Sequence, residues 1–167
     1  PDAQPNSAHM ALAALERQGK LRSVITQNID GLHQKAGSRR VLELHGSILR
    51  NYCEECKKEY GLSHMMETDG IPRCSCGGII KPDVVLYEES LNQDILRQAV
   101  MDISEADLLI VGGTSLSVYP AAGLIDYYRG SRLVLINRDA TPRDREADLL
   151  IRDRIGEVLA SCVDEEL

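Results

Sequence analysis

The sequence predicts an α/β protein with a parallel sheet and one small inserted module, and three observations support this prediction. Short apolar segments alternate with helix-like segments in the C-terminal half of the chain, which is the pattern of βαβ units. The segments at 107–113 and 132–137 have continuously apolar centres, as strands buried on both faces do. Residues 52–81 instead show little periodicity and hold four of the five cysteines. We therefore expect one domain formed by 1–51 and 82–167, into which 52–81 is inserted.

Each expected element has its own local signal. Asn6 or Ser7 can cap a helix that runs to about Gln18, where Gly19 ends it. The apolar side chains that we expect to face the core from this helix are Met10, Ala13, Ala14 and Leu15. The other expected elements are strands at 22–26, 41–44, 107–113, 132–137 and 148–151, an extended run at 84–87, and helices at 91–103, 119–128 and 156–163.

Composition and charge exclude several classes of function. The chain has 167 residues, enough for one compact domain, and its core must be aliphatic because Phe and Trp are absent. A net charge of −7 argues against a nucleic-acid or anionic-membrane binder, since such proteins carry a basic surface. No segment approaches the roughly 20 apolar residues of a membrane span, and the N-terminus lacks the apolar core of a signal peptide. We expect a cytoplasmic protein, and no oligomeric state is predicted.

The four clustered cysteines predict a structural metal site in a reducing compartment. Cys53 and Cys56 are followed, after a loop of typical length, by Cys74 and Cys76. Four thiolates complete a tetrahedral zinc shell, so no position remains for water or substrate. The second pair is Cys-x-Cys, one residue shorter than the common spacing, and its chelation is expected to be tighter. Cys162, on the final expected helix, is predicted to be a small buried residue.

A second candidate site lies at the end of the strand at 107–113. In parallel α/β folds, ligands bind beyond the carboxyl ends of the strands. Gly113 lets the backbone approach a ligand closely, and Thr114 and Ser115 supply hydroxyls and N–H groups suited to phosphate or ribose oxygens. Asn137 follows the next strand, where an amide can hydrogen-bond an adenosine ribose as an acidic residue often does. Plain turn chemistry for the paired glycines is the alternative on these residues alone.

Several strings taken together resemble the sirtuin (Sir2) family, bacterial type, whose members are NAD-dependent protein lysine deacylases. The strings are Thr26–His33, Glu43–Ser47, the two cysteine pairs, Gly113–Ala121 and Asn137–Arg138. The resemblance extends from about Pro5 to Leu159. It implies a Rossmann-like NAD-binding domain with an inserted zinc-ribbon module. It also implies that NAD is the co-substrate, that zinc is structural, and that an acyl-lysine protein or peptide is the partner.

The resemblance further assigns roles to individual side chains. His45 is expected to be the base that deprotonates a ribose hydroxyl, with Asn28 and Asp30 as the other catalytic side chains. The residues expected to contact NAD are Gln27, Asn28, Asp30, Gly113, Thr114, Ser115, Asn137, Arg138 and Ile155. The acyl-lysine peptide is expected to add as an extra strand along Val84, Val85, Leu86 and Tyr87.

One feature of the family has no counterpart in this sequence: an N-terminal strand with a Gly-Ala-Gly-x-Ser turn and a loop that binds the pyrophosphate and nicotinamide. We therefore expect this chain alone to bind NAD poorly and to turn over slowly or not at all. Three alternatives are a non-catalytic NAD or ADP-ribose sensor, a mono-ADP-ribosyltransferase on the same scaffold, and a zinc-ribbon adaptor. The presence of His45 and Asn28 disfavours the sensor, and the adaptor leaves the residues Gly113–Ser115 unexplained. The acyl-chain preference is not predicted.

Overall fold

The computed structural model describes residues 2–163, and the chain divides into two compact units. The sheet unit comprises Pro1–Ile25, Leu32–Leu42 and Gln93–Leu167, and the cysteine unit comprises Thr26–Gly31 and Glu43–Asn92. Each unit has a core of its own. The predicted boundaries of the inserted module, 52 and 81, were drawn from the cysteine content of the sequence. The two units above are defined by compactness instead, so the predicted boundaries stay a prediction.

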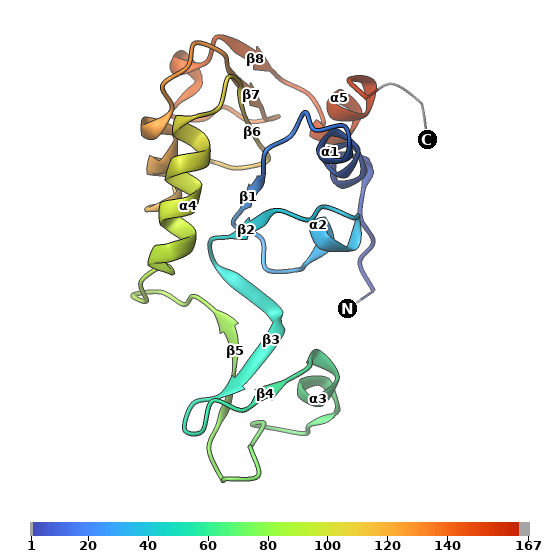
Figure 1. The fold of residues 1–167 in the computed structure, drawn as a ribbon, viewed down its shortest axis with the longest axis vertical. Helices are drawn as coiled ribbons and strands as arrows, with labels where there is room; N and C mark the ends of the chain where they lie inside the picture. The colour runs from blue at the N-terminus through green and yellow to red at the C-terminus, as the bar shows by residue number, and fades with distance from the viewer. Residues whose placement is uncertain (1, 164–167) are drawn as a thin grey trace. The chain divides into compact units, whose positions relative to one another are not determined.

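The sheet unit is built on three parallel strands in the order β6–β7–β8, which confirms the predicted parallel α/β sheet. The strands are β6 (Leu109–Gly112), β7 (Leu133–Ile136) and β8 (Leu149–Ile151). The α-helices are α1 (Ser7–Arg17), α2 (Leu32–Lys35), α4 (Gln93–Ser104) and α5 (Ile155–Ser161), and the 3-10 helices are η1 (Ala121–Tyr127) and η2 (Asp144–Glu146). Figure 1 shows α1 and α5 on one side of the three strands and α4 on the other. The helix expected at 119–128 is present as η1, which has the tighter 3-10 form.

β7 is packed on both faces, as its continuous apolar sequence predicts. Successive side chains of a strand point to opposite faces. Ile136 belongs to a cluster with residues of α1 and α5, namely Ala8, Ala11 and Leu159. Leu133 and Leu135 belong to a second cluster with Leu116 and Ile125. The strand thus joins two layers of side chains and fixes the position of its own carboxyl end.

The expectation that the strand at 107–113 is buried on both faces is wrong. Leu108 is 47% exposed and Ile110 is 38% exposed. Within the described residues β6 is an edge strand, because its pairing runs from Leu109 opposite Leu133 to Gly112 opposite Ile136 on β7 alone. An edge strand has fewer neighbours to cover its side chains, and this accounts for the exposure.

The predicted N-terminal helix is confirmed as α1. The Asn6 side chain accepts a hydrogen bond from the His9 backbone N–H, and His9 Nδ1 accepts one from the Asn6 N–H, so the two residues form a capping box. Gly19 follows the helix with a φ of +70°, which glycine adopts without strain. Met10 was expected to face the core but is 46% exposed. Ala13 and Ala14 are buried as predicted, and Ala8, His9 and Ala11 are buried with them.

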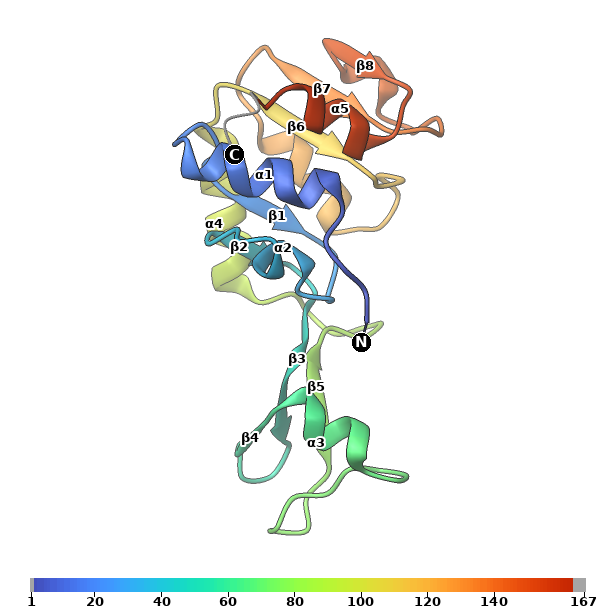
Figure 2. The same cartoon turned by 90° about the vertical axis from the view of Figure 1, so that its right-hand side faces the viewer.

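The cysteine unit is an antiparallel hairpin system that periodicity did not predict. β3 (Gly46–Cys53) lies between β4 (Glu59–Tyr60) and β5 (Ile80–Val84), as Figure 2 shows. The short helix α3 (Leu62–Glu67) follows β4. The two remaining strands, β1 (Val24–Thr26) and β2 (Val41–Glu43), form a two-stranded sheet. The 22–26 and 41–44 predictions are thus confirmed in position and shortened in length.

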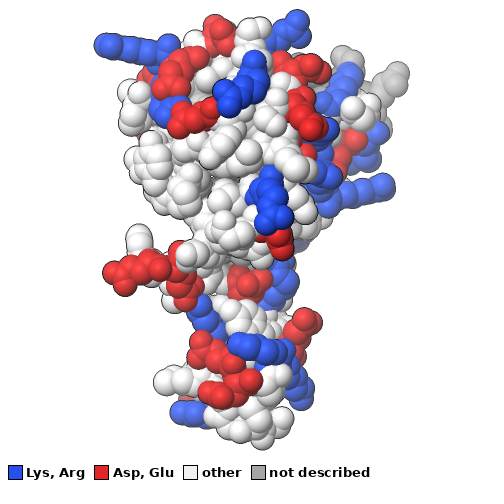
Figure 3. All heavy atoms as spheres, turned by 60° about the vertical axis from the view of Figure 1, so that its left-hand side comes forward, with Lys and Arg blue, Asp and Glu red and all other residues white. Residues whose placement is uncertain are grey.

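Two surface properties bear on function. On the face drawn in Figure 3, acidic and basic side chains are interspersed, and no extended basic patch is visible there. Among residues 2–163, no helix is both long enough and apolar enough to cross a membrane.

Candidate functional site

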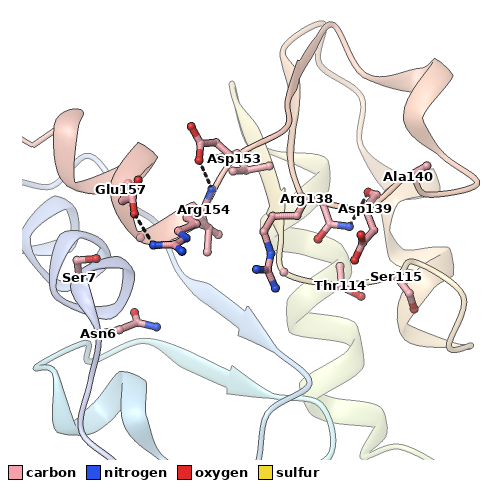
Figure 4. Close-up of a pocket in the computed structure, with 15 residues that line it drawn as sticks. Asn6, Ser7, Thr114, Ser115, Arg138, Asp139, Ala140, Asp153, Arg154 and Glu157 are labelled. Carbon is pink, nitrogen blue, oxygen red and sulfur yellow. Dashed lines mark hydrogen bonds and ion pairs between the residues drawn. The ribbon is translucent and has the colours of Figure 1, made fainter.

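The first hollow of interest lies in the sheet unit and has a volume of about 580 Å³. It is lined by the segment after β6, the segment after β7, and the first residues of α1 and α5 (Figure 4). The structure brings together here six of the residues expected to contact NAD, namely Gly113, Thr114, Ser115, Asn137, Arg138 and Ile155. The hollow thus lies at the carboxyl ends of parallel strands, where this fold class binds ligands.

Glycines allow the backbone and Ile155 to approach closely at this hollow. A Cβ atom on Gly112 would lie 2.3 Å from Ile155 Cδ1 and 3.2 Å from the Ile136 carbonyl oxygen. Gly113 has a φ of +65°, in the left-handed region that L side chains rarely adopt. A Cβ on Gly156 would lie 2.5 Å from Ser7 Oγ, so α1 and α5 also meet at a glycine.

The polar groups of the hollow are partly committed to each other. Asn137 Nδ2 donates to the Asp139 carbonyl oxygen at 3.0 Å. The side-chain oxygen of Asn137 can accept from a ligand hydroxyl, which is what a ribose offers. Thr114 Oγ1 accepts from the Leu116 N–H at 3.3 Å, and the hydroxyls of Ser115 and Ser117 are 2.6 Å apart. These contacts order the loop that follows β6.

Charge in the hollow is mixed. Arg138 lines it from the segment after β7, and Arg154 lines it from the position directly before α5; Figure 4 shows both side chains. Arg154 Nη1 lies 3.1 Å from Glu157 Oε1, which partly neutralises it. Two guanidinium groups beside hydroxyls and backbone N–H groups suit an anionic ligand such as a phosphate ester. Sequence reasoning missed the other polar lining residues, Asn6, Ser7, Asp139, Asp153 and Glu157; the capping signal at Asn6 was the one available clue.

A second hollow of about 420 Å³ lies in the cysteine unit. It is lined by Gln27, Asn28, Ile29, Asp30, His45, Val84 and Val85. These include all four polar residues that the sequence assigned to the reacting end of NAD, and two of the four assigned to the peptide. Leu86 and Tyr87 do not line it and are 56% and 101% exposed. The run predicted to be extended over 84–87 is strand only at Val84, where β5 ends. A turn follows, in which the Leu86 carbonyl accepts from the Glu89 N–H at 3.1 Å and Glu88 has a φ of +71°.

Backbone contacts hold His45 in a defined tautomer. His45 Nδ1 lies 3.1 Å from the carbonyl oxygen of Gln27. A carbonyl can only accept, so Nδ1 carries the proton and the neutral ring presents its lone pair at Nε2. The His45 carbonyl in turn accepts from the Val85 N–H at 3.1 Å, which ties the histidine to the chain after β5. Nε2 is thus prepared to take up a proton.

An arginine braces the strands that carry this hollow. Arg50 Nη1 lies 2.7 Å from Glu43 Oε2, and Arg50 Nε lies 2.9 Å from Asp83 Oδ2. Partial burial lowers the pKa of Arg50, but the hydrogen bonds to Glu43 and Asp83 outweigh it, and the net shift is upward. The β3–β5 register is interrupted between Ser47 and Asn51, opposite Pro82, which has no N–H to donate. Arg50 bridges the two strands at that interruption.

The four clustered cysteines converge as the spacing predicts. Their Sγ atoms all lie within 4.8 Å of one another. Cys53 and Cys76 approach to 3.5 Å, and so do Cys56 and Cys74. The backbone N–H of Cys76 and the hydroxyl of Tyr60 lower the pKa of Cys74 to about 5, so that sulfur is a ready anionic ligand. Four sulfur donors in one closed cluster fit a structural zinc ion.

The short Cys-x-Cys half-site is accommodated by a glycine. Gly77 N–H donates to the Cys74 carbonyl at 2.8 Å, with Gly77 at a φ of +91°. In the longer half-site the Lys57 N–H donates to the Cys53 carbonyl at 3.0 Å, and Lys57 has a φ of +60°. Each cysteine pair therefore lies in a turn that contains one residue in the left-handed region, Gly77 or Lys57. Cys162 lies apart in the sheet unit and is exposed, which corrects the expectation of a buried residue.

Replacement of Cys53 by serine is expected to abolish zinc binding and unfold the cysteine unit. Cys53 is fully buried in the core of that unit, and metal affinity of such sites is coupled to folding. Zinc content by mass spectrometry should fall from one ion per chain to none, with loss of a thermal transition. Cys162→Ser, a cysteine outside the cluster, is the control and should retain the metal. Full zinc occupancy in Cys53→Ser would contradict the assignment.

The parallel sheet with a glycine turn beside its ligand hollow, together with a four-cysteine module, defines a nucleotide-binding α/β protein with a structural metal centre. The chain matches the Sir2 family over residues 1–120 and belongs to that family. The family assignment confirms the resemblance read from the sequence.

Relatives and solved structures agree with this assignment. The NAD-dependent protein deacetylase of Clostridium perfringens is 59% identical over 166 residues, which are 98% of this chain and 68% of the relative. The structure titled "Sir2-p53 peptide-NAD+" has a TM-score of 0.91 at 43% identity and covers 98% of this chain and 70% of its own. A Sir2 complex with an inhibitor, 2'-O-acetyl-ADP-ribose and a deacetylated p53 peptide also has a TM-score of 0.91 at 43% identity, with 98% and 73% covered.

Proposed function

We propose that this protein is an NAD-dependent protein lysine deacetylase, which transfers the acyl group of an acyl-lysine side chain to ADP-ribose and releases nicotinamide. The observation that carries the proposal is the second hollow, where His45 is fixed by the Gln27 carbonyl beside Asn28 and Asp30. The relatives named NAD-dependent protein deacetylase and the structural neighbour that contains 2'-O-acetyl-ADP-ribose support the reaction type.

His45 is the base in this proposal. Acyl transfer to a ribose hydroxyl requires that the hydroxyl lose its proton, and a neutral imidazole can accept that proton near physiological pH. Because Nδ1 is bound to the Gln27 carbonyl, the proton arrives at Nε2 and the resulting imidazolium keeps its hydrogen bond. A backbone carbonyl also stabilises the positive charge by its dipole.

The remaining polar groups of the second hollow orient the reacting end of NAD. The Asn28 side chain can donate and accept, as binding of a water or a ribose hydroxyl requires. The backbone N–H of Asn28 donates to Thr26 Oγ1 at 3.0 Å, which fixes the turn after β1. Asp30 can accept a hydrogen bond from the carboxamide N–H of nicotinamide. Gln27 is the remaining polar residue proposed to contact this end of NAD. When bound, NAD supplies the ADP-ribosyl group that receives the acyl chain.

The hollow of the sheet unit holds the adenosine end in this proposal. Gly113, Thr114 and Ser115 present N–H and hydroxyl groups to phosphate and ribose oxygens. Asn137 accepts from a ribose hydroxyl, Arg138 contributes charge, and Ile155 offers an apolar surface to the adenine. Support comes from the convergence of all these residues on one hollow of suitable size.

The acyl-lysine partner is proposed to bind along the chain after β5. Val84 and Val85 line the second hollow and can contact the apolar stem of an acyl-lysine. Leu86 and Tyr87 follow them in the chain and are exposed, so they can contact residues that flank the lysine. An added peptide strand gains affinity from main-chain bonds and so depends little on sequence.

Zinc is proposed to be structural and to hold the cysteine unit together. The four sulfurs leave no coordination position for a substrate. Thiolate ligands persist in a reducing compartment, and we propose a cytoplasmic location on that ground.

Product analysis tests this function. Because this chain alone is expected to turn over slowly or not at all, the assay uses a version that also carries the N-terminal segment of the Clostridium perfringens relative. Incubation of that version with NAD and an acetyl-lysine peptide should yield the deacetylated peptide and an acetylated ADP-ribose in equal amounts, as mass spectrometry can measure. A peptide that instead gains the mass of one ADP-ribosyl group would show mono-ADP-ribosyl transfer. Binding of ADP-ribose without any change in the peptide would favour the sensor over the enzyme.

A further inference from the structure

The register of β7 and β8 places an arginine beside the loop that lines the first hollow. Ile136 pairs with Ile151, and the Asn137 N–H donates to the Ile151 carbonyl at 3.0 Å. The residues that follow the two strands, Asn137 and Arg152, are therefore neighbours. Arg152 itself is not among the residues that line the hollow. Any influence of Arg152 on a ligand there must act through the loop.

Arg152 binds the main chain of that loop at two points. Its Nη1 donates to the carbonyl oxygen of Asn137 at 3.4 Å and also to that of Asp139. The Asp139 carbonyl accepts from Asn137 Nδ2 as well, so one oxygen is held by two donors. Because Arg138 lies between these two carbonyls, its backbone is fixed on both sides.

Asp144 binds the second terminal nitrogen of the Arg152 guanidinium and so holds the side chain in place. Arg152 Nη2 forms an ion pair with Asp144 Oδ2. Asp144 Oδ1 accepts from the Thr141 hydroxyl at 2.7 Å and from the Thr141 N–H at 3.1 Å. These bonds to Thr141, together with Arg152, hold the pKa of Asp144 below its usual range, so the carboxylate is charged at neutral pH. Arg152 thus links the segment after β7 to the 3-10 helix η2.

We propose that Arg152, held by Asp144, is a positioning residue that fixes Asn137 and Arg138 in the orientation that binds the adenosine ribose. This inference rests on the proposed function of the first hollow. A ligand group gains most when its partners are already ordered, because less conformational freedom is lost on binding. Loss of Arg152 removes one donor from each of the two carbonyls, leaves the Asp139 carbonyl with Asn137 Nδ2 alone, and lets the loop sample other positions.

The test measures ADP-ribose affinity by calorimetry in the full chain. Arg152→Gln is expected to bind ADP-ribose roughly tenfold more weakly, because two hydrogen bonds to loop carbonyls and the ion pair with Asp144 are lost. Arg152→Lys keeps the charge but has one donor nitrogen in place of the guanidinium fork, and it should recover part of the affinity. The control is Arg145→Gln, which removes the same charge from an exposed arginine of η2 that has no ion pair within the described residues. Melting temperatures should agree among all four proteins.

Turnover separates positioning from general damage. Arg152→Gln should raise KM for NAD while kcat and the KM for the acyl peptide stay near the parental values. Equal ADP-ribose affinity in Arg152→Gln and the parent, or an equal loss in Arg145→Gln, would overturn the inference while the proposed function stands. If the parent itself does not bind ADP-ribose, the assignment of the hollow fails and this inference fails with it.

Discussion

Gly46→Ala is expected to disrupt the cysteine unit strongly, because Gly46 has the least room for a Cβ atom of the glycines in that unit. A Cβ atom at Gly46 would lie 1.9 Å from the carbonyl oxygen of Asp83, a backbone atom that cannot rotate away. Gly46 also has a φ of +77°, which costs an L side chain about 1–2 kcal/mol. With the displacement of β5, we expect a loss of more than about 3 kcal/mol in unfolding free energy.

The consequence for function follows from the pairing of the strands. Gly46 lies opposite Val84 and Ser47 opposite Asp83, at the point where β3 and β5 meet beside the second hollow. Displacement of β5 would move Val84 and Val85 and break the bond from the Val85 N–H to the His45 carbonyl. Chemical denaturation measures the stability of the variant, and a peptide-binding assay measures its function. Gly61→Ala is the control, since Gly61 has an ordinary φ of −77° and its nearest neighbour would be Ser63 Oγ at 3.8 Å. A Gly46→Ala protein as stable as the control would contradict the account.

His45→Gln is expected to lower turnover by roughly 10²- to 10⁴-fold, the usual contribution of a general base. Glutamine keeps a polar side chain of similar reach but has no group that can accept a proton at neutral pH. The fold, the zinc content and the affinity for ADP-ribose should be unchanged, because His45 contributes a single side-chain hydrogen bond to the Gln27 carbonyl. Steady-state deacetylation kinetics with a zinc assay measure both parts of this prediction.

A second histidine serves as the control for this substitution. His33 lies in the sheet unit, where its ring is 4.6 Å from that of His9, and it does not line either hollow. His33→Gln should therefore keep most of the activity. Equal activity of His45→Gln and the parent would show that another group deprotonates the ribose.

The sheet unit was largely predictable because its signals are local. The apolar run of β7 marks a strand packed on both faces, and Asn6 marks the start of α1. The glycines after β6 mark a turn beyond a strand end. Each of these signals lies within a few residues of the structure that it specifies, so periodicity and capping rules suffice.

The cysteine unit was predictable in its metal site and not in its strands. Cysteine spacing reports four ligands directly, but β3 pairs Gly46 with Val84 and Cys53 with Ile80 across long loops. No local period reveals such pairing, and the burial pattern of β3 does not alternate along a strand whose register with β5 shifts between Ser47 and Asn51. Leu86 and Tyr87 were expected beside the acyl-lysine with Val84 and Val85, but only the two valines line the hollow.

The candidate site shows the same division. The residues of the first hollow at strand ends follow from the fold class, whereas Ser7 reaches it through a contact with Gly156 that no local pattern indicates. The second hollow was proposed through family resemblance, since a lone histidine or an Asn-x-Asp-Gly string is an ordinary turn signal. The roles of the individual residues stay predictions until they are tested by substitution.

The most direct test of the central claim is nicotinamide release from NAD, with and without an acetyl-lysine peptide. Since the chain covers about two thirds of the Clostridium perfringens relative, the assay compares it with a version that carries that relative's N-terminal segment. We predict that the version with the added segment releases nicotinamide only when the peptide is present, and that His45→Gln lowers this release by roughly a hundredfold or more. Release that is independent of the peptide, or no release from either version despite bound zinc, would contradict the central claim.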